Sequence, residues 1–444
     1  MSRPRRVNLP PEVAPRHRAR VPAGTPRPGA DLESAPIDSA LAPHVAVGAV
    51  ERAGYAPVLN GGFQSIAASA HEMHTEIADT VFGAVLRVPG IAAPTRLAQS
   101  VHDAIAEGVY GAVRRSADAA FGLAGQVERL ARDPAHVPGA AEQSLRSALN
   151  AVVGDALHAG ASGVAVPMEL RAGTAPLGVT PVALAMLRPR VCLFVHGLGC
   201  NESSWWRGAA AWNGSPWHLG GSQDALPIHY APLLEREFGV SAIHLRYNTG
   251  LSLDTNAARL AALLERAASA APQVTEWLLI GHSMGGLVAR GAHAHALREQ
   301  LAWPGKAPMI VCLGSPHQGA PLERIGRLAA AALQVAAVTR PLARLANARS
   351  QGIRDLRRGM HGRADAGAPA LRFVAATLAT DPTSRVGKAL GSSIGDGLVP
   401  TDSATDADAR GDVQRVVLAG LGHMDLLNHP RVYEAIRPWI AAGR

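Results

Sequence analysis

Residues 277 to 287 read Trp-Leu-Leu-Ile-Gly-His-Ser-Met-Gly-Gly-Leu, an apolar run that ends in the pattern Gly-x-Ser-x-Gly. The pattern predicts a buried strand over Glu276 to Ile280, followed at once by a helix over Met284 to Glu299. A serine on such a sharp turn presents its hydroxyl, and the glycines on either side lack the Cβ atoms that would keep strand and helix apart. With 46 glycines in the chain, a chance glycine-rich turn is the alternative. The flanking strand and helix favour Ser283 as a catalytic nucleophile.

The chain has 444 residues and 48% hydrophobic composition, which is enough for one large domain with appendages. The formal charge is +8 and the pI is near 10.1. Much of the excess lies among prolines near the start, where seven arginines are opposed by Glu12 alone. This composition predicts a disordered basic tail over residues 1–55. Since no recognised nucleic-acid module accompanies the tail, we expect no nucleic-acid partner.

Neither a secretory signal peptide nor a membrane-spanning segment is visible in the sequence, which favours a cytoplasmic location, with peripheral membrane association as an alternative. The chain has three cysteines, too few for a fully paired disulfide framework. Cys192 and Cys312 lie within apolar strand candidates and are predicted to be buried free thiols.

Residues 56–160 form a predicted helical extension. One apolar stripe runs through Ile66, Met73, Ile77, Val81 and Val85, a second runs from Val101 to Val113, and a third begins at Leu145. Core packing is the favoured reading of these stripes, because most amphipathic stripes are core faces. A protein partner or a lipid surface are the alternatives.

Residues 161–444 alternate short β-rich runs with helices, which predicts an α/β fold with a mostly parallel sheet and flanking helices. The strand candidates are Val164–Leu170, Val179–Leu187, Val191–Val195, Val240–Tyr247, Trp277–Ile280, Met309–Leu313, Leu371–Leu378 and Val413–Leu418. Two stretches interrupt the alternation and are candidate caps over a site. One is Ser203–Pro232, which holds four of the seven tryptophans, and the other is the arginine-studded helical insertion at 319–367, for which a surface insertion is an equal alternative.

A catalytic serine needs a histidine base and an acid that orients it, and in this kind of sheet they follow in the chain order Ser, Asp, His. His423 lies just beyond the last strand candidate, so it is the predicted base. His429 precedes Pro430 at a helix start and is better explained as a capping-region residue.

For the acid, Asp396 is favoured over Asp381 and Asp402. Gly395 and Gly397 allow a tight turn that can aim the Asp396 carboxylate. Asp381 follows a strand sooner and stays a rival, with turn capping as its alternative role. The amides of Leu198 and Met284 are the predicted oxyanion donors, the first from the turn His-Gly-Leu-Gly at 196–199.

These motifs resemble the α/β-hydrolase superfamily, and more narrowly its bacterial lipases and inositol-deacylase-like serine esterases. The resemblance rests on His-Gly-Leu-Gly at 196–199, Gly-His-Ser-Met-Gly-Gly-Leu-Val-Ala-Arg at 281–290, Gly-Ser-Pro-His-Gln-Gly-Ala-Pro at 314–321, Asp-Gly-Leu-Val-Pro at 396–400 and Gly-His at 422–423. It covers residues 163 to 444 and implies an α/β-hydrolase fold with a helical lid at 319–367. It also implies hydrolysis of carboxylic esters without a cofactor.

The sequence therefore predicts a serine ester hydrolase, a lipase or carboxylesterase, whose substrate is an ester with an apolar, lipid-like acyl chain. A thioesterase or acyltransferase would use the same triad, and a non-catalytic partner-binding protein is the alternative from another class. No cofactor is expected. No metal is expected either, because Asp402, Asp406 and Asp408 lack a calcium-binding spacing.

Overall fold

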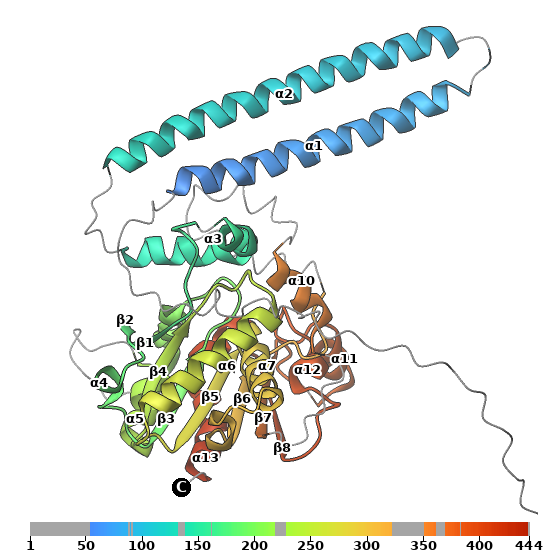
Figure 1. Cartoon of the computed structure of the whole chain (residues 1–444). Coiled ribbons are helices and arrows are strands. Elements are labelled where there is room, and N and C mark those ends of the chain that lie inside the picture. Colours follow the sequence, from blue (N-terminus) through green and yellow to red (C-terminus); the bar gives the residue numbers. More distant parts are fainter. Residues whose placement is uncertain are drawn as a thin grey trace, which may run out of the picture. The chain divides into compact units, whose positions relative to one another are not determined.

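The computed structural model describes residues 54–87, 89, 92–131, 138–160, 162–217, 228–321, 350–360, 369–381 and 383–442. Nearly all of the predicted basic tail, up to residue 53, lies outside the described residues. Residues 322–349 and 361–368 of the predicted cap also lie outside them. Figure 1 shows the described helices and strands.

An eight-stranded sheet forms the centre of the described residues from 162 onward, in the order β2-β1-β4-β3-β5-β6-β7-β8. Strands β3 to β8 pair in parallel, whereas β1 pairs antiparallel with both β2 and β4. The bounds are β1 Glu169–Ala172, β2 Ala175–Leu177, β3 Arg190–Val195, β4 Ser241–Arg246, β5 Glu276–His282, β6 Met309–Leu313, β7 Ala370–Thr377 and β8 Val413–Ala419. The mostly parallel sheet that the sequence predicts is confirmed.

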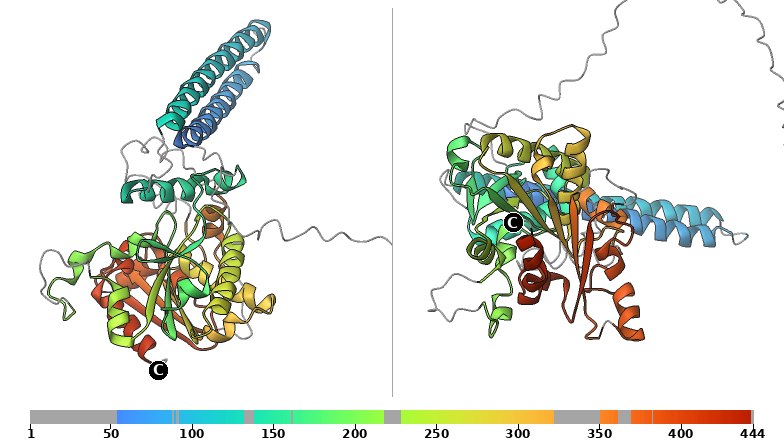
Figure 2. Two further views of the ribbon diagram at one scale, coloured as in Figure 1. Left: turned by 60° about the vertical axis from the view of Figure 1, so that its left-hand side comes forward. Right: turned by 90° about the horizontal axis from the view of Figure 1, so that it is seen from below.

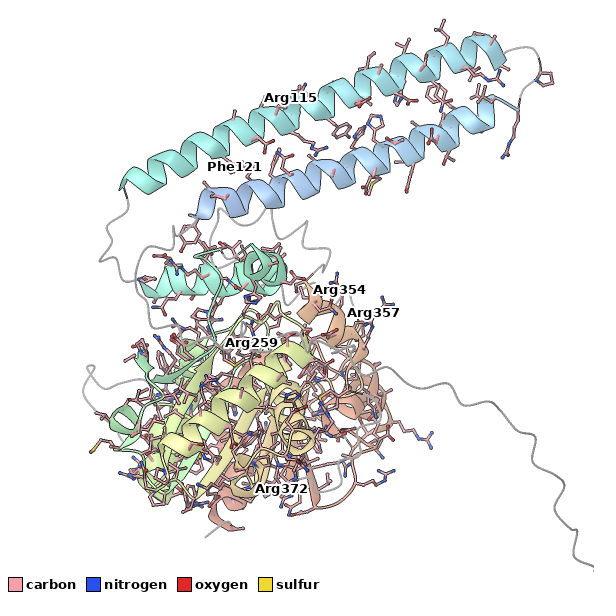
Figure 3. All side chains as sticks on the ribbon, in the orientation of Figure 1. Arg115, Phe121, Arg259, Arg354, Arg357 and Arg372 are labelled. Carbon is pink, nitrogen blue, oxygen red and sulfur yellow. The ribbon has the colours of Figure 1, made fainter. Side chains whose placement is uncertain are left out.

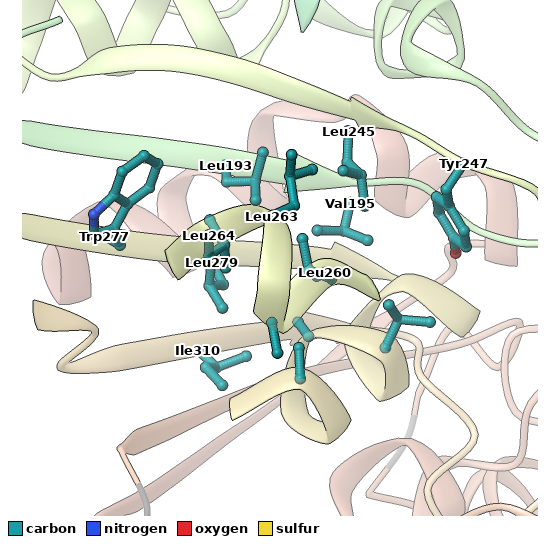
Figure 4. Packing of buried hydrophobic residues seen from close by; sticks show 14 of the residues in the cluster. Leu193, Val195, Leu245, Tyr247, Leu260, Leu263, Leu264, Trp277, Leu279 and Ile310 are labelled. Carbon is teal, nitrogen blue, oxygen red and sulfur yellow. The ribbon is translucent and has the colours of Figure 1, made fainter. Parts of the chain in front are cut away.

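Alternate residues of the central strands enter two different apolar cores, because successive side chains of a strand point to opposite faces. Leu193 and Val195 of β3 pack with α6 (Leu253–Ala270) and α7 (Met284–Arg298). Figure 4 shows this core, in which Leu260, Leu263 and Leu264 of α6 lie against the sheet. Phe194 belongs instead to the core that α5 (Tyr230–Phe238) and α13 (Pro430–Ala442) cover. Helices thus cover both faces, as Figure 2 shows.

The remaining described elements of this part are short. They are α4 Pro181–Leu184, α10 Gln351–Arg358, α11 Arg385–Ser393, α12 Thr401–Thr405, and the 3₁₀ helices η2 Glu202–Trp206, η3 Ala209–Trp212, η4 Trp303–Lys306 and η6 His423–Leu427. The strand predicted at Val179–Leu187 is wrong. The Thr180 hydroxyl caps the first turn of α4 by accepting a hydrogen bond from the Ala183 amide, and Pro181 favours the first helical position. Cys192 and Cys312 are buried free thiols, as predicted.

Three helices precede the sheet: α1 Tyr55–Val85, α2 Ala92–Ala131 and α3 Ala140–Ala159. Helices α1 and α2 form an antiparallel hairpin, in which Phe121 lies near Phe63 with ring centroids 6.2 Å apart (Figure 3). The expectation that the first two apolar stripes are core faces is wrong, because Met73, Ile77 and Ile105 are about 60% exposed. No helix among the described residues is both long enough and apolar enough to cross a membrane.

Helix α3 packs closely on the loop after β4. A Cβ atom on Gly154 would lie only 2.0 Å from the side-chain oxygen of Asn248. The side-chain nitrogen of Asn248 donates a hydrogen bond to the Gly154 carbonyl at 2.8 Å. The Ser350 hydroxyl before α10 donates to the Ala151 carbonyl at 2.6 Å. Helix α3 is therefore joined to the sheet region by buried hydrogen bonds.

Candidate active site

The turn between β5 and α7 is a strained elbow with Ser283 at its tip. Ser283 has φ 54° and ψ −124°, a backbone conformation that costs a side-chain-bearing residue free energy. A Cβ on Gly281 would lie 2.4 Å from the Gly286 nitrogen, and one on Gly285 would lie 2.1 Å from the Val195 carbonyl oxygen. Both glycines are therefore required by close backbone approach, and the predicted strand-turn-helix is confirmed.

Asp396 and His423 meet at the same edge of the sheet, beyond the ends of β7 and β8. The His423 Nδ1 lies 2.7 Å from the Asp396 Oδ2, and both side chains are almost fully buried. The other carboxylate oxygen accepts hydrogen bonds from the amides of Leu398 (3.0 Å) and Val399 (2.8 Å). The His423 amide also donates to the Asp396 carbonyl at 3.0 Å, so backbone contacts fix both partners.

This contact determines which nitrogen of His423 carries the proton. An ionised carboxylate only accepts hydrogen bonds, so Nδ1 donates and a neutral ring leaves Nε2 with its lone pair. The Nε2 atom is buried and has no hydrogen-bond partner among the described residues. A basic nitrogen in that state can take a proton from a hydroxyl placed within reach.

His282, next to Ser283, connects the elbow to the histidine, and it is a residue that the sequence analysis missed. Its Nε2 donates to the His423 carbonyl at 3.0 Å, and the two rings lie 4.7 Å apart. Burial, together with the neighbouring His423, holds the pKa of His282 well below its usual range, so the ring is neutral. Its place inside the Gly-x-Ser-x-Gly pattern was the available signal.

The loop at 196–199 lies directly against the elbow. A Cβ on Gly197 would be 2.9 Å from the Ser283 Cβ, so the loop backbone approaches the serine closely. The loop is held by the Tyr247 hydroxyl, which donates to the His196 carbonyl at 2.8 Å. Met284 is the first residue of α7, where an amide has no acceptor within the helix. The assignment of the Leu198 and Met284 amides as oxyanion donors stays a prediction that fits this arrangement.

His196 serves as a brace in this loop. Its ring stacks on Tyr247 at 4.6 Å, and its Nδ1 lies 3.0 Å from the Gly197 carbonyl. Burial lowers the pKa of His196 to about 4, so it is neutral near pH 7.

The rival acids lie elsewhere. Asp381 is exposed and its Oδ1 accepts hydrogen bonds from the Thr383 amide (3.0 Å) and hydroxyl (2.6 Å), which lower the pKa of Asp381. It therefore caps a turn. Asp402 is exposed in the first turn of α12. Of the three candidates, Asp396 is the one that the structure brings to His423.

The tryptophan-rich stretch is core and not cap in its described part. Trp205 and Trp212 are 1% and 0% exposed. Trp205 packs edge-on against Phe194 at 5.0 Å, and Trp212 against Tyr230 at 6.2 Å. The indole nitrogen of Trp212 donates to the Asn428 side chain at 2.9 Å. These rings support the loops behind the site and present little surface to a ligand.

A second unforeseen cluster joins α7 to α12. The Arg290 Nη1 lies 2.7 Å from the Asp406 carboxylate and 2.8 Å from the His317 Nδ1. An arginine only donates, so His317 accepts through Nδ1, and burial beside the cation keeps the pKa of His317 well below its usual range. The cluster fixes the turn at 314–319, in which a Cβ on Gly314 would lie 3.2 Å from the Asp396 Oδ2.

Comparisons with known proteins agree with this architecture. A family described as "PGAP1-like alpha/beta domain" matches residues 247–363, which include the elbow. No curated protein matches the chain. The solved structures that resemble it include the mature form of the Bacillus licheniformis lipase BlEst2, at 17% identity and a TM-score of 0.38, over 57% of this chain and 93% of that one.

Two further solved structures share a similar extent of the chain. A thermophilic esterase from Thermogutta terrifontis is 15% identical with a TM-score of 0.33, over 62% of this chain and 93% of that one. YbtT, a type II thioesterase of a yersiniabactin biosynthetic pathway, is 15% identical with a TM-score of 0.35, over 57% and 92%. The mostly parallel sheet with its strained strand-turn-helix elbow, together with the family that matches residues 247–363, supports an α/β-hydrolase fold for this part of the chain.

Proposed function

We propose that the protein is a serine ester hydrolase with Ser283 as nucleophile, His423 as general base and Asp396 as the acid that orients it. The observation that carries the proposal is the buried 2.7 Å contact between Asp396 and His423. The His423 Nε2 is buried without a hydrogen-bond partner among the described residues, at the sheet edge where the strained Ser283 also lies.

The reaction proceeds in two halves. The Ser283 hydroxyl attacks the carbonyl carbon of the ester while the His423 Nε2 takes its proton, and the resulting oxyanion accepts hydrogen bonds from the Leu198 and Met284 amides. The intermediate collapses when His423 returns the proton to the leaving alcohol, which leaves an acyl-enzyme. Water, deprotonated by His423, then releases the carboxylic acid and restores the serine.

The proposed substrate is a carboxylic ester with an apolar acyl chain. Three buried apolar residues surround the site: Leu198 in the 196–199 loop, Met284 at the elbow and Leu426 in η6 with the base His423. Helix α10 packs close to Met284, because a Cβ on Gly352 would lie 3.2 Å from the Met284 Cε. These three apolar side chains are as deeply buried as Trp205 and Trp212, so they make the surroundings of the elbow apolar without presenting open surface, and the acyl-chain series below is the test of the acyl group.

The test compares wild type with Ser283→Ala on p-nitrophenyl esters of acetate, butyrate, octanoate and laurate, and on the matching acyl thioesters. We expect kcat to fall roughly 10⁴-fold or more in the variant, because the triad acts as a unit. Ser269→Ala, at an exposed serine on α6, is the matched control and should leave kcat unchanged. A fluorophosphonate probe should label wild type and not Ser283→Ala. Unchanged turnover in the variant would contradict the proposal, and a preference for thioesters would redirect it to a thioesterase.

A further inference from the structure

The hairpin of α1 and α2 is held together by polar side chains. The Asn60 amide donates to Asp118 at 2.7 Å, His74 and His102 lie 3.1 Å apart through their Nε2 atoms, and the Gln99 amide donates to Asp79 at 3.0 Å. Small buried residues, Ala67, Ala78 and Ala106, separate these contacts. The surface between the two helices thus consists largely of polar, small and aromatic side chains, including Phe63 against Phe121.

The large apolar side chains of the same helices lie outside that surface and are exposed. Met73 is 63% exposed, Ile77 59% and Ile105 61%. The residues that share one side, here called the apolar face, are Met73, Ile77, Val81, Val101, Ile105 and Val109, each between 51% and 63% exposed.

Helix geometry places these residues on one side of the hairpin. At 100° per residue, Met73 and Ile77 lie roughly 110° from the line of α1 residues that contact α2, and Ile105 lies roughly 120° from the corresponding line on α2. Both angles run in the same direction of rotation when each helix is followed from its amino to its carboxyl end. In antiparallel helices equal offsets fall on the same side, so the two stripes form one continuous surface.

The opposite side of the hairpin carries charge. Over residues 71–110 there are five acidic residues against Arg87 and Arg96, and α1 contains no Lys or Arg. By the same geometry Glu72, Asp79 and Glu107 lie roughly 80–115° to the other side of the contact lines. The hairpin is therefore amphipathic as a unit, with an acidic polar face.

A hollow of about 260 Å³ opens where the apolar face meets the surface between the two helices. It is lined by His74, His102, Ile105, Ala106, Val109 and Tyr110. Its size suits a large side chain from a neighbouring helix, in the manner of a knob entering a hole.

We propose that the apolar face binds the apolar face of a second copy of this chain, so that two hairpins form a four-helix bundle. Taking roughly 160–200 Å² as the full area of such a side chain, the six residues expose on the order of 600 Å², which is the lower end of the area that each partner gives to a specific interface. In this arrangement the acidic face of each hairpin lies on the side opposite the dimer contact, so the two acidic faces do not meet. A lipid surface fits less well, because helices that lie on membranes carry Lys or Arg on their polar face.

The test is the oligomeric state of the full chain, measured by sedimentation velocity and light scattering over a micromolar concentration range. We expect a dimer in wild type and a dissociation constant raised at least about 100-fold in Ile105→Glu, because the contact would enclose two facing carboxylates. Ala104→Glu is the matched control, since Ala104 is exposed on the neighbouring helix position away from the apolar face. It should leave the dimer intact. Circular dichroism should show unchanged helix content in both variants.

A monomeric wild type overturns the proposal, and so does a dimer that survives Ile77→Glu combined with Ile105→Glu. A monomer that cosediments with phosphatidylcholine vesicles, and loses this binding in Ile105→Glu, would instead assign the face to lipid. A monomer that dimerises only after deletion of residues 1–50 would assign it to that segment of the same chain. Either result overturns docking of a second copy in the intact protein.

Discussion

The two carboxylate oxygens of Asp396 have different hydrogen-bond partners. One holds the His423 ring at 2.7 Å, while the other is fixed by two backbone amides of the following residues. This second set of contacts makes the orientation of the ring independent of solvent. Replacing the carboxylate with an amide keeps the shape but offers a donor where Nδ1–H must donate, so the ring is driven toward the wrong tautomer.

Asp396→Asn should therefore lower kcat on a p-nitrophenyl ester by about 10³-fold to 10⁴-fold with a small change in stability. Asp381→Asn is the control, because the Asp381 carboxylate caps an exposed turn by accepting hydrogen bonds from Thr383. Its kcat should stay within about twofold of wild type. Steady-state kinetics of both variants check the expectation, and an equal loss in the two would remove Asp396 from its assigned role.

At this scale the sequence predicts residues whose place follows from strand order. Ser283 and His423 lie just beyond β5 and β8, so chain order brings both to one sheet edge, whereas Asp396 is separated from β7 by α11 and is favoured because of the glycines beside it. His282 and Arg290 could not be selected in this way. Their function depends on which carbonyl or carboxylate lies opposite, and those partners, His423 and Asp406, are distant in sequence.

Among the elements, the junction of β5, α7 and the end of β3 leaves no room for an added side-chain atom at Gly285. The first turn of α7 touches the backbone of the 195–196 segment through Gly285, where an added Cβ would meet two carbonyl oxygens at 2.1 and 2.6 Å. Carbonyl oxygens held in a sheet and a loop cannot withdraw by that amount without local rearrangement.

Gly285→Ala should lower the free energy of unfolding by about 3 kcal/mol and reduce esterase activity, since Ser283 and the 196–199 loop would both shift. Gly305→Ala is the matched change in η4, where an added Cβ meets nothing within 4 Å. It should alter the free energy of unfolding by no more than about 0.5 kcal/mol. Urea denaturation of the three proteins measures both effects. Equal stability of Gly285→Ala and wild type would contradict the close packing described here.

Element prediction succeeds where local pattern and tertiary packing agree. The strands β3, β5 and β6 are continuous apolar runs, as expected for strands buried on both faces. The strand expected at Val179–Leu187 fails because the apolar content hides a helix start at Thr180 and Pro181. The apolar stripes of α1 and α2 show a second limit. Periodicity predicts that a helix has an apolar face, but it does not predict which surface that face contacts.

The whole molecule buries several histidines in their neutral form. His196 and His244 have pKa values lowered by burial to about 4 and about 3, and His282 and His317 are held well below the usual range. In the unfolded chain each titrates near pH 6.5. Between that pH and about 4 the unfolded state binds more protons than the folded state, so the stability that neutral burial allows is present above pH 6.5 and is lost as the pH falls.

We expect the free energy of unfolding to decrease from pH 7 to pH 5, with each such histidine adding up to about 1.4 kcal/mol per pH unit to the slope. His244→Phe should remove the contribution of one histidine from that slope. The fold should accept the phenyl ring, because the His244 ring already stacks on Phe194 at 5.2 Å and neither nitrogen has a hydrogen-bond partner among the described residues. Urea unfolding at several pH values checks this expectation. A slope identical to wild type would show that His244 is not neutral in the fold.

The interior placement of the cysteines has a consequence for the surroundings in which the protein can work. Burial raises the pKa of Cys192 and Cys312 to about 12 and raises that of Cys200, so the thiolate that oxidants attack is scarce at all three positions. The proposed chemistry at Ser283 uses no thiol. We therefore expect the stability of the fold and the activity of the proposed site to be the same under reducing and oxidising conditions.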